Sequence, residues 1–350
     1  MEEAIRQFNT QFEWKPVVVN GEQLSLGGST SKRGLEVEPL GFRKFILDGM
    51  GGSHLAADLL LAYRPEIDLS VFSDYGIPSL PPARLKDALL IASSFSGNTE
   101  EPIDFAEKAL AKGLPLAVIA KGGKLLEFAK IHNLSHVALP PTKIQPRSGL
   151  GFQILALAAL LREEPLLREI AELASTLRPA ELEGKGKELA AALRGEIPVI
   201  YASARNQAIA YNWKIKFNET GKVPSFFNIF PELNHNEMTG FDITPTTEGL
   251  SRKFHFIFLT DSADHPKIGK RMQMTKKLYE DRGLSVTEVP IEDTPPAEDG
   301  SAPLDRGDNR LQKMFSSLLI ADWTALHLSK IYGTEAEQVP MVEEFKRLIA

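Results

Sequence analysis

The sequence predicts an α/β protein built from two successive subdomains, each a parallel β-sheet flanked by helices. From residue 42 onward, short apolar runs rich in β-branched residues alternate with helical stretches, as in parallel sheets. The alternation pauses over a charged helical stretch at residues 165–194 and then starts again. A chain of 350 residues, 43% of them hydrophobic, is long and apolar enough for two such cores.

The first half contains three strand–turn–helix units and two isolated strands. Turns rich in glycine or hydroxyl residues separate the strands from the helices, and Gly113 ends the second helix. Ahead of these units, a hairpin that turns at Asn20-Gly21 is expected within residues 17–30. The units span 42–63, 87–113 and 114–133, the isolated strands lie at 69–75 and 135–140, and an apolar helix follows over 146–164.

The second half repeats this order after the charged stretch. Strand–helix pairs are expected at 197–222 and 253–283, single strands at 225–235 and 284–292, a polar loop at 292–309, and closing helices at 310–333 and 340–350. We therefore divide the chain into an N-terminal segment (1–40), a first subdomain (41–160), a helical connector (161–194) and a second subdomain (195–350). The sequence of residues 1–40 and 292–309 contains no pattern that indicates a role.

Composition excludes several functions. The formal net charge is −6, so the chain lacks the basic character expected of a protein that binds nucleic acid or a membrane surface. It has no cysteine, which excludes disulfides, thiolate nucleophiles and cysteine-bound zinc. The opening MEEAIRQFNTQFEW does not resemble a signal peptide, and no apolar run reaches the ~18–20 residues of a membrane span. We expect a soluble cytoplasmic protein.

Two turns carry the first functional signal: GMGGSH at 49–54, here called the glycine turn, and SSFSGNT at 93–99, the hydroxyl turn. Each stands where a strand ends and a helix begins, at the edge where open parallel sheets bind ligands. Free amides at a helix start, glycines and hydroxyls together can hold a phosphate without lysine. Ordinary capping, with Asn98 and Glu101 as a pair, would explain one or two of these residues but not four or five.

Neither turn belongs to a nucleotide-binding motif. The glycine turn lacks the Gly-x-Gly-x-x-Gly spacing of a dinucleotide site, and no Gly-Lys-Ser/Thr follows it as in a P-loop. A nucleotide cofactor is therefore disfavoured.

Taken together, several motifs resemble one family. GMGGS, SSFSGNTEE and PRSGLGF are similar to sugar isomerase (SIS) domains, and FNETGKVP, PELNHNEMTGF and VPMVEEFKRLIA extend the likeness to the bifunctional phosphoglucose/phosphomannose isomerases. The similarity covers residues 40–350. It implies two flavodoxin-like SIS subdomains, a homodimer with the active site at the interface, a sugar-phosphate substrate, and neither metal nor nucleotide cofactor. It would place the chain in glycolysis and gluconeogenesis.

The resemblance also assigns roles to individual residues. Arg147 would lie near the reacting end of the sugar. The phosphate contacts would come from Gly52, Ser53, Ser94, Ser96 and Thr99, and catalysis from Glu219, His235 and Lys346. His54 departs from the small or apolar residue expected after the glycine turn, and it could touch the substrate or cap the helix.

Aldose–ketose isomerisation needs the kinds of group that these residues provide. A carboxylate must move a proton between C1 and C2 through a cis-enediol, and a donor must stabilise the enediolate oxygen. Glu219 suits the base, Arg147 the donor, and His235 with Lys346 the opening of the sugar ring.

Each of these residues also has a plainer explanation. Glu219 could be a solvated glutamate at a helix end, Arg147 a helix-entry arginine, and Lys346 a solvated lysine. His235 could be an ordinary loop histidine, or a metal ligand with Glu237, although no third or fourth ligand is visible.

These interpretations lead to one preferred function and two alternative functions. The preferred one is interconversion of glucose 6-phosphate, together with mannose 6-phosphate, and fructose 6-phosphate. A sugar-phosphate sensor would keep the hydroxyl turn and lose the base, whereas this chain has both Glu219 and His235. The isomerase half of a glucosamine 6-phosphate synthase would need a glutaminase domain with an N-terminal cysteine, which a chain without cysteine lacks.

Overall fold

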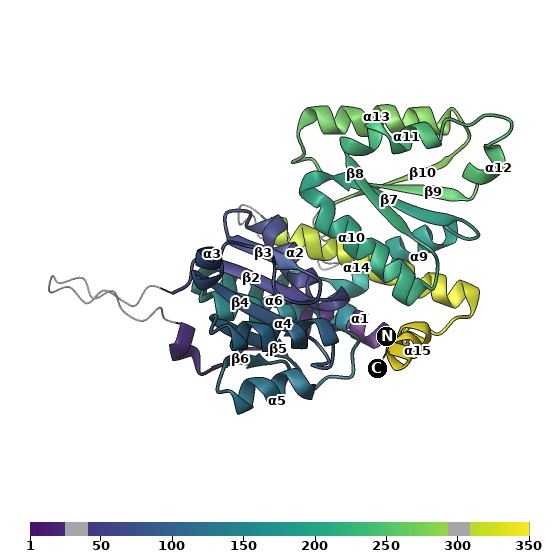
Figure 1. Ribbon diagram of the computed structural model, residues 1–350. Coiled ribbons are helices and arrows are strands. Elements are labelled where there is room, and N and C mark those ends of the chain that lie inside the picture. Colours follow the sequence, from purple (N-terminus) through teal and green to yellow (C-terminus); the bar gives the residue numbers. More distant parts are fainter. Residues whose placement is uncertain (25–40, 293–308, 350) are drawn as a thin grey trace. The chain divides into compact units, whose positions relative to one another are not determined.

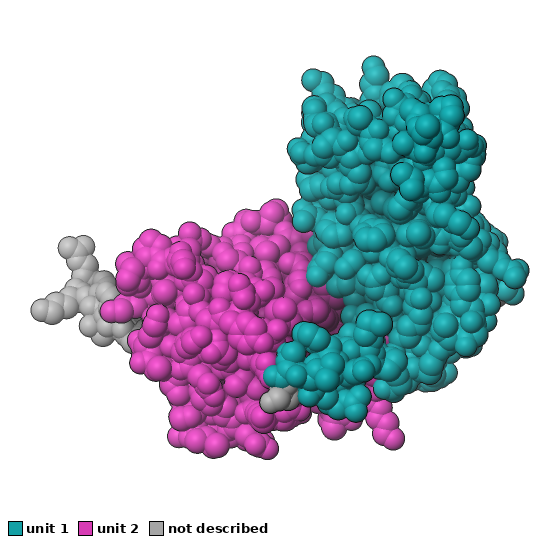
Figure 2. Space-filling model, turned by 45° about the vertical axis from the view of Figure 1, so that its right-hand side comes forward, with its two compact units in different colours: residues 1–7, 176–350 teal, residues 8–175 magenta. Residues whose placement is uncertain are grey.

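The computed structural model describes residues 1–24, 41–292 and 309–349. The chain forms two compact units, coloured separately in Figure 2. Unit 1 comprises residues 1–7 and 176–350, and unit 2 comprises residues 8–175. The division falls within the stretch 161–194 that was expected to connect two subdomains, and the N-terminal segment contributes to both units.

Unit 2 is built on a six-stranded sheet with the order β1-β6-β5-β4-β2-β3 (Figure 1). All neighbouring strands are parallel except β1, which runs antiparallel to β6. Strand β1 occupies the place where a hairpin was expected, but its partner is β6; the remainder of that hairpin, residues 25–30, lies outside the described residues. The strands are β1 (Val18–Val19), β2 (Lys44–Gly49), β3 (Asp68–Phe72), β4 (Ala88–Ser94), β5 (Leu116–Ala120) and β6 (Ser135–Ala138).

Helices cover both faces of this sheet, as the alternation in the sequence predicts. On one face, side chains of β2, β4 and β5 form a core with α3, α4 and α5. The apolar helix α6 contacts β5 and β6 and packs against α2. The helices are α2 (Leu55–Tyr63), α3 (Pro82–Lys86), α4 (Glu100–Ala111), α5 (Gly123–Ile131), α6 (Leu150–Leu161) and α7 (Glu164–Ala171), with α8 (Leu173–Thr176) at the division between the units.

Unit 1 has a four-stranded, wholly parallel sheet with the order β10-β9-β7-β8. Its strands are β7 (Ile197–Ser203), β8 (Phe226–Phe230), β9 (Phe254–Thr260) and β10 (Ser285–Pro290). Aromatic side chains of β7, β8 and β9 form a core with α13, while α10 and α14 pack together and α9 packs on α14. The helices are α1 (Glu2–Arg6), α9 (Glu183–Ala192), α10 (Gln207–Lys216), α11 (Glu237–Gly240), α12 (Glu248–Ser251), α13 (Pro266–Glu280), α14 (Arg310–Tyr332) and α15 (Pro340–Ile349).

Both sheets confirm the predicted α/β class and share a flavodoxin-like strand order. In unit 2 the chain steps from β2 to β3 on one side and then to β4 on the other, so the order reverses between β2 and β4. In unit 1 the same reversal falls between β7 and β9. Ligands of such sheets bind beyond the carboxyl ends of the two strands at the reversal.

Two further expectations from the sequence concern the polar loop and membrane-spanning segments. The polar loop at 292–309 lies almost entirely outside the described residues. Among the described residues, no helix combines the length and apolar character needed to cross a membrane.

Candidate active site

The glycine turn and the hydroxyl turn follow β2 and β4, the two strands at the reversal point of unit 2. Gly49 and Ser93 are partners in the strand register, so the turns begin side by side. The structure therefore brings together the two segments that the sequence singled out, at the edge of the sheet where a ligand is expected.

The glycine turn is shaped by close backbone packing. Residues 51–53 form a 3₁₀ turn, and Gly51 has a φ of +51°, in the region that favours glycine. A Cβ on Gly52 would lie 2.7 Å from Cβ of Pro146 and 2.9 Å from the backbone nitrogen of Arg147. Gly52 is thus needed for the turn at Pro146–Ser148 to approach the glycine turn.

The hydroxyl turn is held by its own side chains. Ser94 Oγ donates to Thr99 Oγ1 at 2.9 Å and accepts from the amide of Gly97 at 3.1 Å. Thr99 is the N-cap of α4, so the free amides of that helix begin at this hydroxyl pair. Ser96 is exposed, and its Oγ accepts from the amide of Asn98 at 3.2 Å. The turn thus presents hydroxyls and a helix start in one place, which suits an anion.

Ser53 joins the two turns. Its Oγ accepts from the amide of Phe95 at 2.9 Å, and its carbonyl accepts from Ser93 Oγ at 2.9 Å. Ser53 and Ser93 are both buried. These bonds fix the spacing between the glycine turn and the hydroxyl turn.

Arg147 lies in the 3₁₀ turn Pro146–Ser148 and is only 1% exposed. The same turn packs against the glycine turn through Gly52. The backbone of this buried arginine therefore lies next to the glycine turn.

Two glutamines that the sequence did not single out support the turn that carries Arg147. Gln11 Nε2 donates to the carbonyl of Ser148 at 2.7 Å, and its Oε1 accepts from the amide of Gly151 at 3.1 Å. Gln153 Nε2 donates to the carbonyl of Pro146 at 2.9 Å. Gln11 comes from the N-terminal segment, to which the sequence assigned no role, and its spacing from Arg147 gives no local signal.

His54, the departure noted in the sequence, lies at the junction of the glycine turn and α2. It is buried, and its Nδ1 lies 2.7 Å from Oδ2 of Asp58, one helical turn further on. The carboxylate thus orients the imidazole at the end of the glycine turn.

Glu219 belongs to unit 1, in the π-helical turn Phe217–Gly221 that continues α10. The sequence predicted a helix end here, and this wider turn ends the helix; such turns are frequent at functional sites. Glu219 is half-buried. Just before the turn, Lys216 Nζ lies 2.7 Å from both carboxylate oxygens of Asp322, a buried ion pair that anchors this segment to α14.

His235 ends the 3₁₀ turn Glu232–His235 of unit 1 and is exposed. The structure gives no support to the alternative that His235 and Glu237 share a metal ion. The carboxylate of Glu237 already accepts hydrogen bonds from Tyr201 and Asn228. In the part of the chain that the structure describes, no group of three or more His, Cys, Asp or Glu residues could hold a metal ion.

Lys346 lies on α15 of unit 1 and is exposed. Its Nζ is 3.0 Å from Oε1 of Glu343, one turn earlier on the same helix. The three predicted catalytic residues of unit 1 therefore come from separate elements: the π-helical turn, the 3₁₀ turn after β8, and α15.

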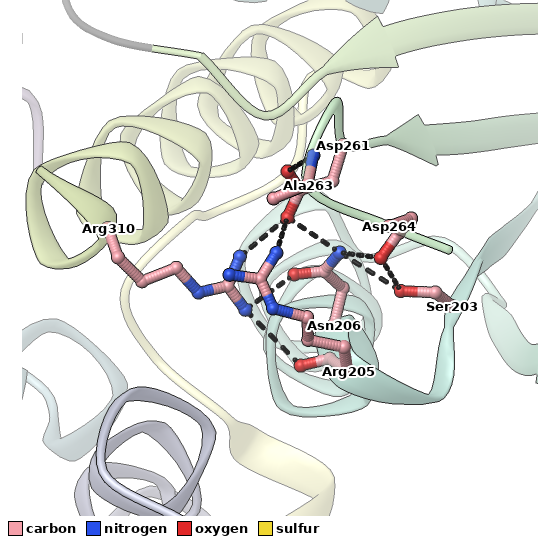
Figure 3. Close-up of polar contacts among 7 residues, drawn as sticks. All are labelled: Ser203, Arg205, Asn206, Asp261, Ala263, Asp264 and Arg310. Carbon is pink, nitrogen blue, oxygen red and sulfur yellow. Dashed lines mark hydrogen bonds and ion pairs between the residues drawn. The ribbon is translucent and has the colours of Figure 1, made fainter. Parts of the chain in front are cut away.

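The reversal point of unit 1 holds a different arrangement (Figure 3). Oδ2 of Asp261 accepts from Arg310 at 2.6 Å, Arg205 at 2.8 Å and Asn206 at 3.1 Å, and Oδ1 accepts from the amide of Ala263 at 2.9 Å. Burial favours the neutral acid, but these donors outweigh it and hold the pKa of Asp261 below its ordinary value. Here the chain supplies its own anion to two arginines.

Comparison with known proteins identifies the family. The family model described as the C-terminal SIS domain of bacterial phospho-glucose isomerase matches residues 182–349. A bifunctional phosphoglucose/phosphomannose isomerase of Aquifex aeolicus is 30% identical over 98% of this chain and 96% of its own length. One of the same name from Caldicellulosiruptor bescii is 30% identical over 88% of this chain and 89% of its own length. The chain belongs to the family of bifunctional phosphoglucose/phosphomannose isomerases.

Solved structures agree on the fold of the family. The C-terminal domain of glucosamine-fructose-6-phosphate aminotransferase from Francisella tularensis superposes with a TM-score of 0.61 at 12% identity, covering 97% of this chain and 96% of that one. At this identity the likeness supports the SIS architecture and nothing finer. The resemblance drawn from the sequence motifs is thereby confirmed at the level of family and fold.

Proposed function

We propose that this protein interconverts glucose 6-phosphate and mannose 6-phosphate with fructose 6-phosphate. The relatives named bifunctional phosphoglucose/phosphomannose isomerase match nearly the whole chain. The observation within the structure that carries the proposal is the convergence of the glycine turn and the hydroxyl turn at the reversal point of unit 2. A sugar phosphate needs a dianion site of this type.

We assign the phosphate to these two turns, hereafter called the cradle. Ser94, Ser96 and Thr99 supply hydroxyls, the start of α4 supplies amides, and Gly52 with Ser53 lines the opposite side. The reversal point of unit 1 is a poor second choice, because the guanidinium groups of Arg205 and Arg310 are already paired with Asp261 there. We therefore propose that each chain has one phosphate site, the cradle of unit 2.

We assign proton transfer to Glu219. From the open-chain aldose, its carboxylate takes the C2 proton, the carbonyl at C1 becomes an enediolate oxygen, and the proton returns at C1. The hydroxyl proton moves from O2 to O1, which leaves a ketone at C2 with no net oxidation and no cofactor. Arg147 stabilises the enediolate oxygen with its planar set of donors. Because C2 is planar in the intermediate, glucose 6-phosphate and mannose 6-phosphate give the same enediolate, provided that each presents its C2 hydrogen to Glu219.

Ring opening needs a second proton transfer, between the C1 hydroxyl and the ring oxygen. We assign it to His235 and Lys346, which are both exposed in the single chain. An exposed catalytic histidine fits a homodimer in which each subunit completes the active site of the other. We place this dimer in the cytoplasm, in glycolysis and gluconeogenesis.

The proposal is tested by a coupled assay with fructose 6-phosphate. We expect the wild type to produce both glucose 6-phosphate and mannose 6-phosphate, and Glu219→Gln to lose at least ~10²-fold in kcat. Glu280→Gln, which changes an exposed glutamate on α13 of the same unit, is the control and is expected to retain activity. A wild type that binds fructose 6-phosphate without converting it would instead identify a sugar-phosphate sensor.

A further inference from the structure

Asp48 is a buried acid that the proposed mechanism does not use. It is the residue before Gly49, at the carboxyl end of β2, and it is 0% exposed. Neither of its carboxylate oxygens has a hydrogen-bond partner of normal geometry. A buried carboxylate without donors is costly, so the neutral acid is the form that this position accepts.

The strand neighbours of Asp48 offer no positive charge to compensate it. Its partners in the sheet are Phe72 and Ala92, which are uncharged. Burial is the main reason that the pKa of Asp48 rises from 3.8 to about 7, and the backbone amide of Asp74 opposes it. The charges of Glu101 and Asp104 on α4, and of Asp74 after β3, raise the pKa further.

Asp48 also lies beneath the helix whose start forms part of the cradle. In the register of the sheet it faces Ala92, and Ser94 is the next residue on that face of β4. Helix α4 covers this face, with Phe105 and Ala106 in the same core as Ile46 and Ala92. An anion in the cradle and a charged Asp48 would therefore depend on the same positive end of α4.

We infer that Asp48 is a proton-linked determinant of affinity for the substrate phosphate. With a neutral Asp48, the positive end of α4 is available to the dianion. With a charged Asp48, the two anions repel each other across the first turn of α4 and binding weakens. Because the two equilibria are coupled, phosphate binding also favours proton uptake by Asp48. The inference rests on the proposed function, since it takes the cradle as the phosphate site.

The test is calorimetric binding of sorbitol 6-phosphate, a polyol phosphate without the carbonyl that isomerisation needs. Its phosphate, with a second pKa of about 6, is mostly a dianion at pH 7, so its own charge changes little between pH 7 and pH 9. For the wild type, we expect the Kd to increase about tenfold over this range. For Asp48→Asn and Asp48→Ala, which cannot ionise, we expect a change of less than about twofold.

Asp68→Asn is the matched control, because it removes an exposed carboxylate at the start of β3, at the opposite end of the strand from the cradle, and should keep the wild-type pH dependence. A wild-type Kd that does not change with pH would overturn the inference, whether or not the variants fold. So would variants that bind more weakly yet retain the pH dependence, since that describes a structural role. No binding by the wild type at pH 7 would contradict the cradle itself and the proposed function with it.

Discussion

The hydroxyl oxygens of Ser94 and Thr99 lie 2.9 Å apart, one at the end of β4 and the other at the N-cap of α4. This contact closes the hydroxyl turn between residues five positions apart and holds both hydroxyls where the helix presents its free amides. A simple cap would need only one of them. The pair is therefore the part of the cradle most open to testing.

Removal of these hydroxyls should weaken substrate binding more than it slows the reaction. For Ser94→Ala and Thr99→Val we expect the KM for fructose 6-phosphate to increase about tenfold and kcat to stay within about threefold, because the phosphate is held equally in the ground state and the transition state. Steady-state kinetics measures both. Ser135→Ala removes a buried hydroxyl that bonds to Asn20 instead, and it should leave KM unchanged. A loss confined to kcat would remove the pair from phosphate binding.

The hydrogen bonds from Gln11 to the Arg147 turn should affect the rate of the chemical step more than substrate binding. Gln11→Ala removes both bonds that tie the N-terminal segment to the Arg147 turn, so we expect a decrease in kcat of about tenfold. The KM should change less, because the glycine turn and the hydroxyl turn are joined separately through Ser53. Gln7→Ala, at an exposed position, serves as the control. Equal kinetics for Gln11→Ala and the wild type would show that the Arg147 turn does not need this support.

Asp48 should also make stability depend on pH. The pKa of its carboxyl is raised from 3.8 to about 7 in the folded state, so below about pH 4 it is neutral in both folded and unfolded chains. Between about pH 4 and pH 7 the unfolded chain releases a proton that the folded chain keeps, which destabilises the fold progressively; above pH 7 the cost is complete. Relative to wild type, Asp48→Asn should therefore gain Tm from pH 4 to pH 7 and no more above it. Thermal unfolding at pH 4, 6 and 8 measures this, and a constant difference would contradict it.

The ion-pair cluster of unit 1 should serve stability. Asp261 and Arg310 are each only 4% exposed, so Asp261→Ala leaves a buried guanidinium without its carboxylate and should cost about 3 kcal/mol of unfolding free energy. Arg205 is 40% exposed, and Arg205→Ala should cost less than about 1 kcal/mol. Denaturant unfolding compares the two. Equal losses would mean that exposure does not set the strength of these pairs.

Much of the fold could be predicted because its signals are local. Apolar runs such as residues 88–94 are fully buried strands, and the turns after them carry the glycines and hydroxyls that a strand-to-helix change requires. The hydroxyl turn was found for the same reason: Ser94 and Thr99 lie five positions apart in the sequence and meet in the structure.

The missed features depend on contacts between distant segments. Gln11 reaches Ser148 across 137 positions, and β1 pairs with β6 instead of its neighbour, so no local pattern reveals either. Asp48 was hidden for another reason. In a sequence, a single acid within an apolar run is interpreted as a surface residue at the end of a strand. Only the structure shows that the Asp48 side chain is buried and that its carboxylate oxygens lack hydrogen-bond partners of normal geometry.

The most direct test of the central claim is a crystal structure of this protein with fructose 6-phosphate bound. The account predicts the phosphate at the Ser94 and Thr99 hydroxyls and the start of α4, with C1 and C2 within about 3.5 Å of the Glu219 carboxylate. A phosphate bound at the arginines of unit 1, or a sugar whose C1 and C2 lie far from Glu219, would contradict it.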